Sequence, residues 1–303
     1  PFKEHVEWLQ AQDWSDAEAF WRNELEGITA PTSLEIGRPQ NDSASSSAVR
    51  ERRRDQASPV LTSALHNLVQ QHEYLTMNTL VQGAWALLLS RYSGEQDVVF
   101  GATRAGRRSS VEGSESMIGV LINTLPLRVQ IDEHLPVIEW LRQIRRAWIE
   151  MRPHEHTPLV EIQKWSDVEG QSTLFNSLVV FERYELDKHL RSLGGKWEQC
   201  SFRLLQHTGY PITIYGYDGD RLTLELEYDP DIFDGAAIER VLRQLWRVLT
   251  GFAHNPKQAI RDVSLLSSRE KEQRQQWNDT ACSYQRNKGV HQLIREQAEE
   301  TPK

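Results

Sequence analysis

The segment from Met77 to Tyr92 limits the folds open to this chain, because it combines the length of a helix with apolar residues on most of its sides. These apolar residues recur at helical spacing and also fill flanking positions: Leu80, Val81, Ala84, Leu87 and Leu88. Thr76 directly precedes the run and is a suitable N-cap. A helix that is apolar nearly all round must be covered on several sides, so the segment predicts a helix buried between layers.

Several short segments near this helix have the pattern of β-strands. Two of them, Ile212–Tyr217 and Arg221–Tyr228, flank an Asp-Gly turn and predict a hairpin whose second arm has one wet face. The other predicted strands are Val98–Phe100, Ile122–Ile131, Phe175–Phe181 and Trp197–Leu205.

Prolines and capping residues mark the starts of further helices. Pro59 and Pro136 fit first helical turns, and Asp234 fits an N-cap. Ser15, with Glu18 three residues later, has the pattern of a capping box. Strands and helices are therefore mixed and at least one strand pair is antiparallel. This predicts an α/β fold, an α+β sandwich in which a mixed sheet is flanked by helices.

Charge and cysteine content argue against several classes of protein. The 303 residues carry a net charge of −8, which disfavours nucleic acid or an anionic membrane as the main partner. Cys200 and Cys282 are the only cysteines, which predicts a protein of the reducing cytoplasm. The run Val81–Leu89 is too short to span a bilayer. The basic cluster Arg50–Arg54 fits a solvated strand or loop edge, or alternatively a phosphate site.

Two runs that pair glycine with polar or cationic residues follow the long helix. The first leads from a predicted strand to Arg107, and the second passes from Gly119 through Asn123 to Arg128. Glycine beside charged residues at strand ends is typical of functional loops. Two core strands joined by a flexible basic loop would explain the same pattern, and the spacing alone leaves both interpretations open.

Longer segments in chain order carry a family pattern. They are RYSGEQDVVFGATRAGRR at Arg91–Arg108, MIGVLINTLPLRV at Met117–Val129, HEHTPLVEIQKW at His154–Trp165, STLFNSLVVFERY at Ser172–Tyr184 and GYPITIYGYDGDRLTLELEYDPDIFD at Gly209–Asp234. Together they resemble the condensation domain of non-ribosomal peptide synthetases, and specifically its second, C-terminal lobe. The resemblance covers nearly the whole chain.

The resemblance implies a domain order. Residues 1–30 would be crossover helices from an N-terminal lobe, residues 31–265 the C-terminal lobe, and residues 266–303 a linker and the start of a truncated adenylation domain. The fold implied is that of chloramphenicol acetyltransferase, in which two lobes form a V around a tunnel.

The resemblance also implies a reaction and its partners. Donor and acceptor carrier domains would enter from opposite ends, each bringing an aminoacyl or peptidyl group on a phosphopantetheine arm. The acceptor amine attacks the donor thioester and an amide forms, a reaction in which positioning of the substrates supplies much of the rate. No cofactor is expected in this chain itself.

The chain departs from the family at its catalytic signature, a His-His pair followed by Asp-Gly in the first lobe. No two histidines are adjacent here; they are His5, His66, His72, His134, His154, His156, His189, His207, His254 and His291. We therefore expect the signature in a lobe that precedes residue 1, assign no catalytic residue to this chain, and expect it to be inactive alone.

Five residues are candidates for a substrate tunnel or lobe interface. The resemblance implies that either Arg107 or Arg128 pairs with the aspartate of the missing signature. Asn123 and Thr124, in the same motif as Gly119, would line the tunnel or satisfy backbone groups at a strand end.

Other assignments are weaker. His154 and His156 flank Glu155, but their spacing matches no helical two-histidine motif, so no metal site is predicted. An epimerisation domain has the same fold, although its strand motif differs from Val180–Tyr184 here. A non-catalytic module that only binds carrier or partner domains is the alternative from another class.

Overall fold

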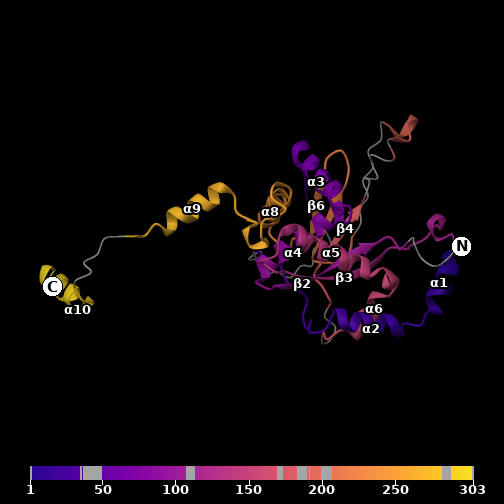
Figure 1. Ribbon diagram of the computed structural model, residues 1–303, viewed down its shortest axis with the longest axis horizontal. Coiled ribbons are helices and arrows are strands. Elements are labelled where there is room, and N and C mark those ends of the chain that lie inside the picture. The colour runs from indigo at the N-terminus through magenta and orange to yellow at the C-terminus, as the bar shows by residue number, and fades with distance from the viewer. Residues whose placement is uncertain are drawn as a thin grey trace. The chain divides into compact units, whose positions relative to one another are not determined.

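The computed structural model forms two compact units, residues 1–265 and residues 266–303, which are described separately. It describes residues 2–34, 36, 50–106, 113–168, 173–182, 190, 192–198, 207–281 and 288–301. The first unit contains the sheet and the helices around it (Figure 1).

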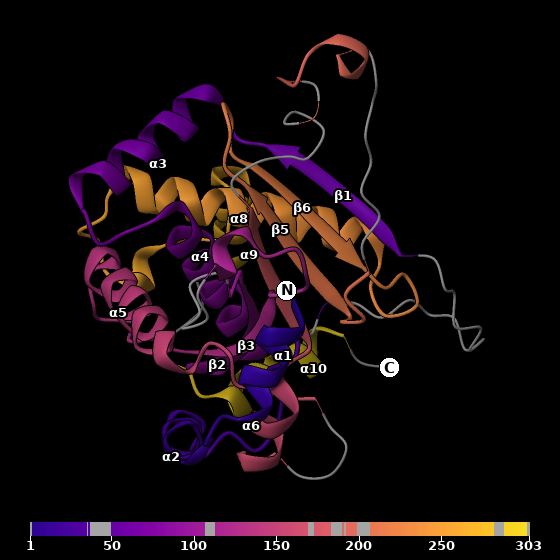
Figure 2. The same cartoon turned by 90° about the vertical axis from the view of Figure 1, so that its right-hand side faces the viewer.

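A mixed sheet lies at the centre of the first unit (Figure 2). Within the described residues it has six strands, in the spatial order β1 (Glu51–Gln56), β6 (Thr223–Tyr228), β5 (Ile212–Tyr217), β4 (Ser177–Glu182), β2 (Asp97–Arg104) and β3 (Asn123–Gln130). The pairs β1–β6, β6–β5 and β2–β3 are antiparallel, whereas β4 runs parallel to both β5 and β2. The predicted hairpin is confirmed as β5–β6, and the predicted α/β class is confirmed. The solvent-exposed face predicted for the second arm is wrong, because every residue of β6 is buried and Arg52 of β1 pairs with Glu225 and Glu227.

Helices cover this sheet in two groups. The helices of the first unit include α1 (Phe2–Gln10), α2 (Ser15–Glu24), α3 (Pro59–Gln71), α4 (Met77–Ser93), α5 (Val137–Glu150), α6 (Leu159–Trp165) and α8 (Gly235–His254). Helices α3, α4, α5 and α8 pack against one another and lie along one side of the strands (Figure 2). Helix α2 packs on α6, which contacts β3.

Helix α4 is the centre of the core, as its sequence predicts. Every residue from Thr79 to Ser90 is buried. The Thr76 side chain accepts the first-turn hydrogen bond from Thr79 N, and Gly94 ends the helix with φ +76°. Helix α5 approaches so closely that a Cβ at Gly83 would overlap the Leu141 side chain. The all-round apolar surface of α4 is therefore matched by cover on all sides.

The two edge strands are built to resist pairing with other chains. Edge strand β1 is rich in arginine, and Arg52 forms ion pairs with the buried carboxylates of Glu225 and Glu227 on β6. Edge strand β3 carries Pro126, which cannot donate a hydrogen bond. Charge and proline are the usual means by which natural sheets protect exposed edges. The basic cluster of the sequence is thus an edge strand.

Two further sequence expectations differ from the structure. Ser15 begins α2 but forms no capping box, because its hydroxyl donates to Asp13 Oδ1 at 2.6 Å and the N-cap position falls on Trp14. The predicted strand Trp197–Leu205 is wrong at its start, where Trp197 ends the 3₁₀ turn Gly195–Trp197. The rest of that predicted strand, residues 199–205, lies outside the described residues.

The second unit contains two polar helices, α9 (Ser268–Asn278) and α10 (Val290–Glu300). Helix α9 begins with a capping box, in which Ser267 and Glu270 exchange hydrogen bonds between side chain and backbone. Neither helix contains a buried residue. In the described parts of both units, no helix has the length and apolar character needed to cross a membrane.

Candidate functional site

The candidate residues lie on the antiparallel strand pair β2–β3. They lie on both faces of the sheet and near both ends of the pair. Arg128 stands opposite Val99, and Arg104 stands opposite Asn123. Directly opposed residues share a face and successive residues alternate, so Arg104 and Arg128 project from opposite faces of the sheet. Arg128 lies five positions after Asn123 along β3, a distance of about 17 Å in a strand.

Arg128 ties three elements together. Its Nη2 and Nε donate to the Asp97 carboxylate on β2, with an Nη2–Oδ2 distance of 2.7 Å. Its Nη1 donates to the backbone oxygens of Glu24 and Glu26, at 2.8 and 3.1 Å, just where α2 ends. These two backbone carbonyls near the C-terminus of α2 thereby accept hydrogen bonds from a positively charged group. Arg128 fixes α2 against the β2–β3 pair.

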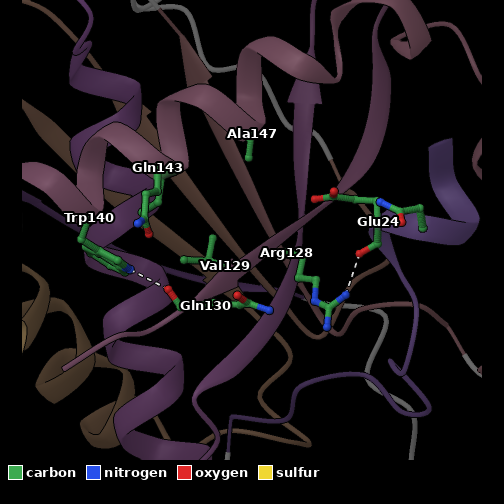
Figure 3. Close-up of a pocket in the computed structure, with 9 residues that line it drawn as sticks. Glu24, Arg128, Val129, Gln130, Trp140, Gln143 and Ala147 are labelled. Atoms are coloured by element: carbon green, nitrogen blue, oxygen red, sulfur yellow. Dashed lines mark hydrogen bonds between the residues drawn. The ribbon is translucent and has the colours of Figure 1, made fainter. Parts of the chain in front are cut away.

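A small pocket of about 240 Å³ opens beside this junction (Figure 3). Figure 3 shows Glu24 and Arg128 on one side of it, and Trp140 and Gln143 of α5 on the other. The Trp140 indole donates to the Gln130 backbone oxygen at 2.8 Å.

Ionisation in this region follows from the same contacts. Burial raises the pKa of the Glu24 carboxyl group, although the nearby Arg128 cation lowers it. The hydrogen bond with Asp97 raises the pKa of Arg128, which therefore stays charged.

Arg104 holds the other end of the pair. Its side chain is buried, forms an ion pair with Glu155 at 3.0 Å and donates a second hydrogen bond to the Trp148 backbone oxygen. The guanidinium carbon lies 4.0 Å from the centre of the Trp148 ring, a cation–π contact. Burial lowers the pKa of Arg104, Glu155 opposes this, and the cations of Arg152 and Arg145 lower it further.

Asn123 connects the start of β3 to the turn that carries Glu155. Its Nδ2 donates to the backbone oxygens of Glu155 and Thr157, at 3.0 and 2.8 Å, and its Oδ1 accepts from Thr124 N at 2.9 Å. The amide thus satisfies backbone groups at a strand end, which is one of the two roles considered from the sequence. Lining of a tunnel by Asn123 and Thr124 stays a prediction.

Two glycines permit close approaches in this region. Gly106 has φ +60°, and a Cβ there would overlap the Leu121 backbone oxygen, so the chain after β2 can lie against the segment before β3 only with glycine. A Cβ at Gly119 would overlap the ring of Phe2 in α1. The absence of a side chain at Gly119 therefore allows α1 to pack against this segment.

Imidazole and aromatic rings complete the contact of α1 with this end of the sheet. His5 lies 5.8 Å from both Trp8 and His156, and Trp8 lies 5.1 Å from His156, measured between ring centres. Burial lowers the pKa values of both His5 and His156. His154 instead stacks on Phe20 of α2 at 4.4 Å.

The structure brings together only part of the predicted set. Gly119 and Asn123 belong to the end of the sheet near Arg104, and Arg128 belongs to the opposite end. Arg107 lies outside the described residues, so its predicted role is untested, as is the pairing of Arg128 with an aspartate of another lobe.

Sequence reasoning missed Arg104, Trp148 and Glu155, which form the buried ion pair and its aromatic wall. One signal was present, because Arg104 follows Val98, Phe100 and Ala102 at alternating positions and so lies on a buried face of β2. A cation on such a face requires a partner. Among the residues that the structure describes, no group of three or more potential ligands could hold a metal ion.

Comparison with known proteins identifies the family. The condensation domain model matches residues 1–274. One polypeptide of the linear gramicidin synthase of Brevibacillus parabrevis is 40% identical over 303 residues, which are all of this chain and 4% of that protein. Another polypeptide of the same synthase is 42% identical over 305 residues, 99% of this chain and 6% of that protein. The chain therefore spans a small fraction of the relatives that it matches.

Solved structures share the fold. A four-domain nonribosomal peptide synthetase bound to AMP and glycine matches with a TM-score of 0.74 and 20% identity, over 96% of this chain and 23% of the other. The X-domain from teicoplanin biosynthesis matches with a TM-score of 0.69 and 23% identity, over 87% of this chain and 60% of the other. The resemblance seen in the sequence is confirmed: the chain belongs to the condensation-domain family of nonribosomal peptide synthetases.

Proposed function

We propose that this chain supplies the C-terminal lobe of a domain that forms an amide between two carrier-bound aminoacyl or peptidyl thioesters. The match of the condensation domain model to residues 1–274 carries this proposal. In the reaction the acceptor amine forms a C–N bond to the donor carbonyl carbon. The C–S bond of the donor thioester breaks, and the amine proton leaves with the released thiol.

The role of this lobe in that reaction is to position substrates. The buried Arg104–Glu155 pair and the Asn123 hydrogen bonds hold the ends of β2 and β3 against the turn at residues 154–157. Holding reacting groups in a fixed geometry can supply a large share of the rate of an acyl transfer. The groups that move protons would come from a first lobe, with which this one would form a tunnel.

An exposed apolar stripe supports the pairing with a first lobe. Ile118, Val120 and Ile122 precede β3 and expose 94%, 79% and 65% of their surfaces. Apolar side chains that line up on a surface usually mark an interaction site. We therefore propose that this stripe, together with Gly119, belongs to the lobe interface.

The domain boundaries belong to the same proposal. Residues 1–30 would cross from the first lobe, residues 31–265 would form the second, and residues 266–303 would lead into an adenylation domain. The division into compact units after Leu265 supports the last of these boundaries. Donor and acceptor carrier domains, each with a phosphopantetheine arm, would be the partners, in the cytoplasm.

A mass-spectrometric assay in deuterated water separates the possible activities. The full-length protein that contains this chain is mixed with carriers loaded with a donor and an acceptor amino acid. Amide formation yields a dipeptide on the acceptor carrier and a free thiol on the donor carrier. Deuterium at Cα without a dipeptide would indicate epimerisation and overturn the proposal.

A partner-binding module is the second candidate. The X-domain in its complex with OxyB from teicoplanin biosynthesis is 25% identical to this chain over 83% of its length, with a TM-score of 0.64. That complex supports a role in which this chain recruits another protein and performs no reaction. Stable binding of a partner by a protein that leaves both loaded carriers unchanged would favour this candidate.

A further inference from the structure

An open pocket of about 570 Å³ lies where β2 ends and the turn after α5 begins. Its lining is Thr103, Arg104, Ala105, Gly106, Trp148, Arg152 and Glu155. The volume lies within the range of small-molecule sites, about 300–1,000 Å³. It exceeds the roughly 30 Å³ share of a single water molecule many times over.

The charges of this lining do not balance. Arg104 and Arg152 are cations, and Glu155 is the only carboxylate among the residues that line the pocket. Glu155 already pairs with Arg104 Nη1 at 3.0 Å and lies 3.8 Å from His156 Nε2. Arg145 adds a third guanidinium close enough to lower the pKa of Arg104. A net positive charge next to a buried cation is costly unless an anion offsets it.

Donors remain for such an anion. The Arg152 side chain is exposed, and among the described residues its guanidinium has no hydrogen bond and no ion pair. Arg104 Nε is buried and has no partner. Because this atom is buried within the protein, Arg104 offers its charge to a ligand in the pocket, and Arg152 offers the hydrogen bonds.

We propose that this pocket binds the anionic group, a carboxylate or a phosphate, of a small molecule, with Arg152 as its main donor and Arg104 as the fixed cation behind it. Guanidinium groups offer forked donors that match both oxyanions. Trp148 and Gly106 give the rest of the ligand an aromatic wall and a stretch of backbone without a side chain. Binding of an anion here goes beyond the proposed amide-forming reaction, although Arg104 and Glu155 also hold the ends of β2 and β3.

Calorimetry with simple anions tests the site in the full-length protein that contains this chain. Inorganic phosphate and acetate are titrated separately at constant ionic strength, with chloride as the balancing salt. We expect one of the two to bind saturably, and the tighter one identifies the chemistry as phosphate or carboxylate. Arg152→Gln should weaken this binding at least about tenfold, as loss of a hydrogen bond between charged groups does. Glu155→Gln should strengthen it, because a competing carboxylate disappears.

The matched control is Arg146→Gln. Arg146 is an exposed arginine of α5, two residues before Trp148 of the pocket lining, and its side chain therefore points about 200° away from that of Trp148. The Arg146→Gln variant should leave the affinity for phosphate or acetate unchanged. Equal effects of Arg146→Gln and Arg152→Gln would reduce the binding to general surface charge and overturn the site. Titrations in which neither phosphate nor acetate binds more tightly than chloride would overturn it as well.

Discussion

Arg128 and Arg104 occupy the two ends of one strand pair and have different environments. Arg128 is partly exposed and directs all its described contacts to groups that fix α2 and β2: Asp97, Glu24 and Glu26. Arg104 is buried, shares one carboxylate and faces a pocket with a surplus of positive charge. The contacts of Arg128 indicate a structural clamp, whereas those of Arg104 are typical of a ligand site.

Replacing Arg128 tests the clamp. Arg128→Ala removes the bidentate pair and leaves two carbonyls at the end of α2 without their donor, so we expect a loss of about 1–3 kcal/mol in the free energy of unfolding. The expected loss of stability is moderate because the Arg128 and Asp97 side chains are 18% and 35% exposed, and water screens such ion pairs. Urea denaturation measures the change.

Lys164→Ala is the control for this variant. Lys164 and Glu161 form an ion pair on the surface of α6, with 61% and 34% exposure, so its loss should change stability by less than about 0.5 kcal/mol. If Arg128→Ala unfolds at the same urea concentration as Lys164→Ala, Arg128 does not fix α2.

At the scale of elements, α1 contacts the turn after α5 through aromatic and imidazole rings, two of which belong to His5 and His156. His5 and His156 are both largely buried, and burial lowers the pKa of each below its ordinary value. Of the charged groups around them, Glu155 favours the protonated form of His156, whereas His5 disfavours it. His154, with the Asp16 carboxylate nearby, also has a pKa lowered by burial. The contact between α1 and this turn therefore favours neutral imidazoles.

This predicts a pH dependence with a definite sign. A histidine whose pKa is lower in the folded state binds protons more readily when unfolded. Its stabilising effect is therefore complete above the unfolded pKa of about 6.5 and is lost as the pH falls below it. The free energy of unfolding should decrease between about pH 7.5 and about pH 5.0.

The variant His5→Phe should flatten this dependence, because it keeps an aromatic ring and removes both the titrating group and a buried nitrogen, Nδ1, that has no partner. His134→Gln changes an exposed histidine and should leave the slope as it is. A slope that stays the same in His5→Phe would show that this contact does not depend on neutral imidazole.

The sequence predicted elements well wherever local pattern decides them. Helix α4 and the β5–β6 hairpin follow from apolar periodicity and an Asp-Gly turn, and both are confirmed. The ion pairs of β1 could not be predicted, because Arg52 finds its partners, Glu225 and Glu227, more than 170 residues away. Ser15 fits a capping box by spacing alone, but the nearer Asp13 takes its hydroxyl.

The candidate site was less predictable for the same reason. Glycine-rich strand ends directed attention to Gly119, Asn123 and Arg128. Which end of β3 meets Glu155 depends on how α5 and the following turn return to the sheet. A tertiary arrangement of that kind leaves no local mark in the sequence.

At the scale of the whole molecule, the boundary near residue 265 can be tested by truncation. Helices α9 and α10 contain no buried residue, so a chain that ends at residue 265 should melt within about 2 °C of the 303-residue chain. A chain that ends at residue 255 loses Ile260 and Val263, which are both buried, together with the bridge from Ala259 to Pro136. It should lose about 3 kcal/mol or more. Equal melting of both truncated chains would contradict this boundary.

The most direct test of the account is the single-turnover rate of amide formation by the full-length protein that contains this chain, with donor and acceptor carriers already loaded. The unmodified protein should convert both carriers into dipeptide and free thiol. Asn123→Ala should be slower by about tenfold or more, because it frees β3 from the turn at residues 154–157 and loosens the substrate geometry. Asn278→Ala, an exposed change in α9, should not alter the rate. An unmodified protein that leaves both loaded carriers intact would contradict the proposed function.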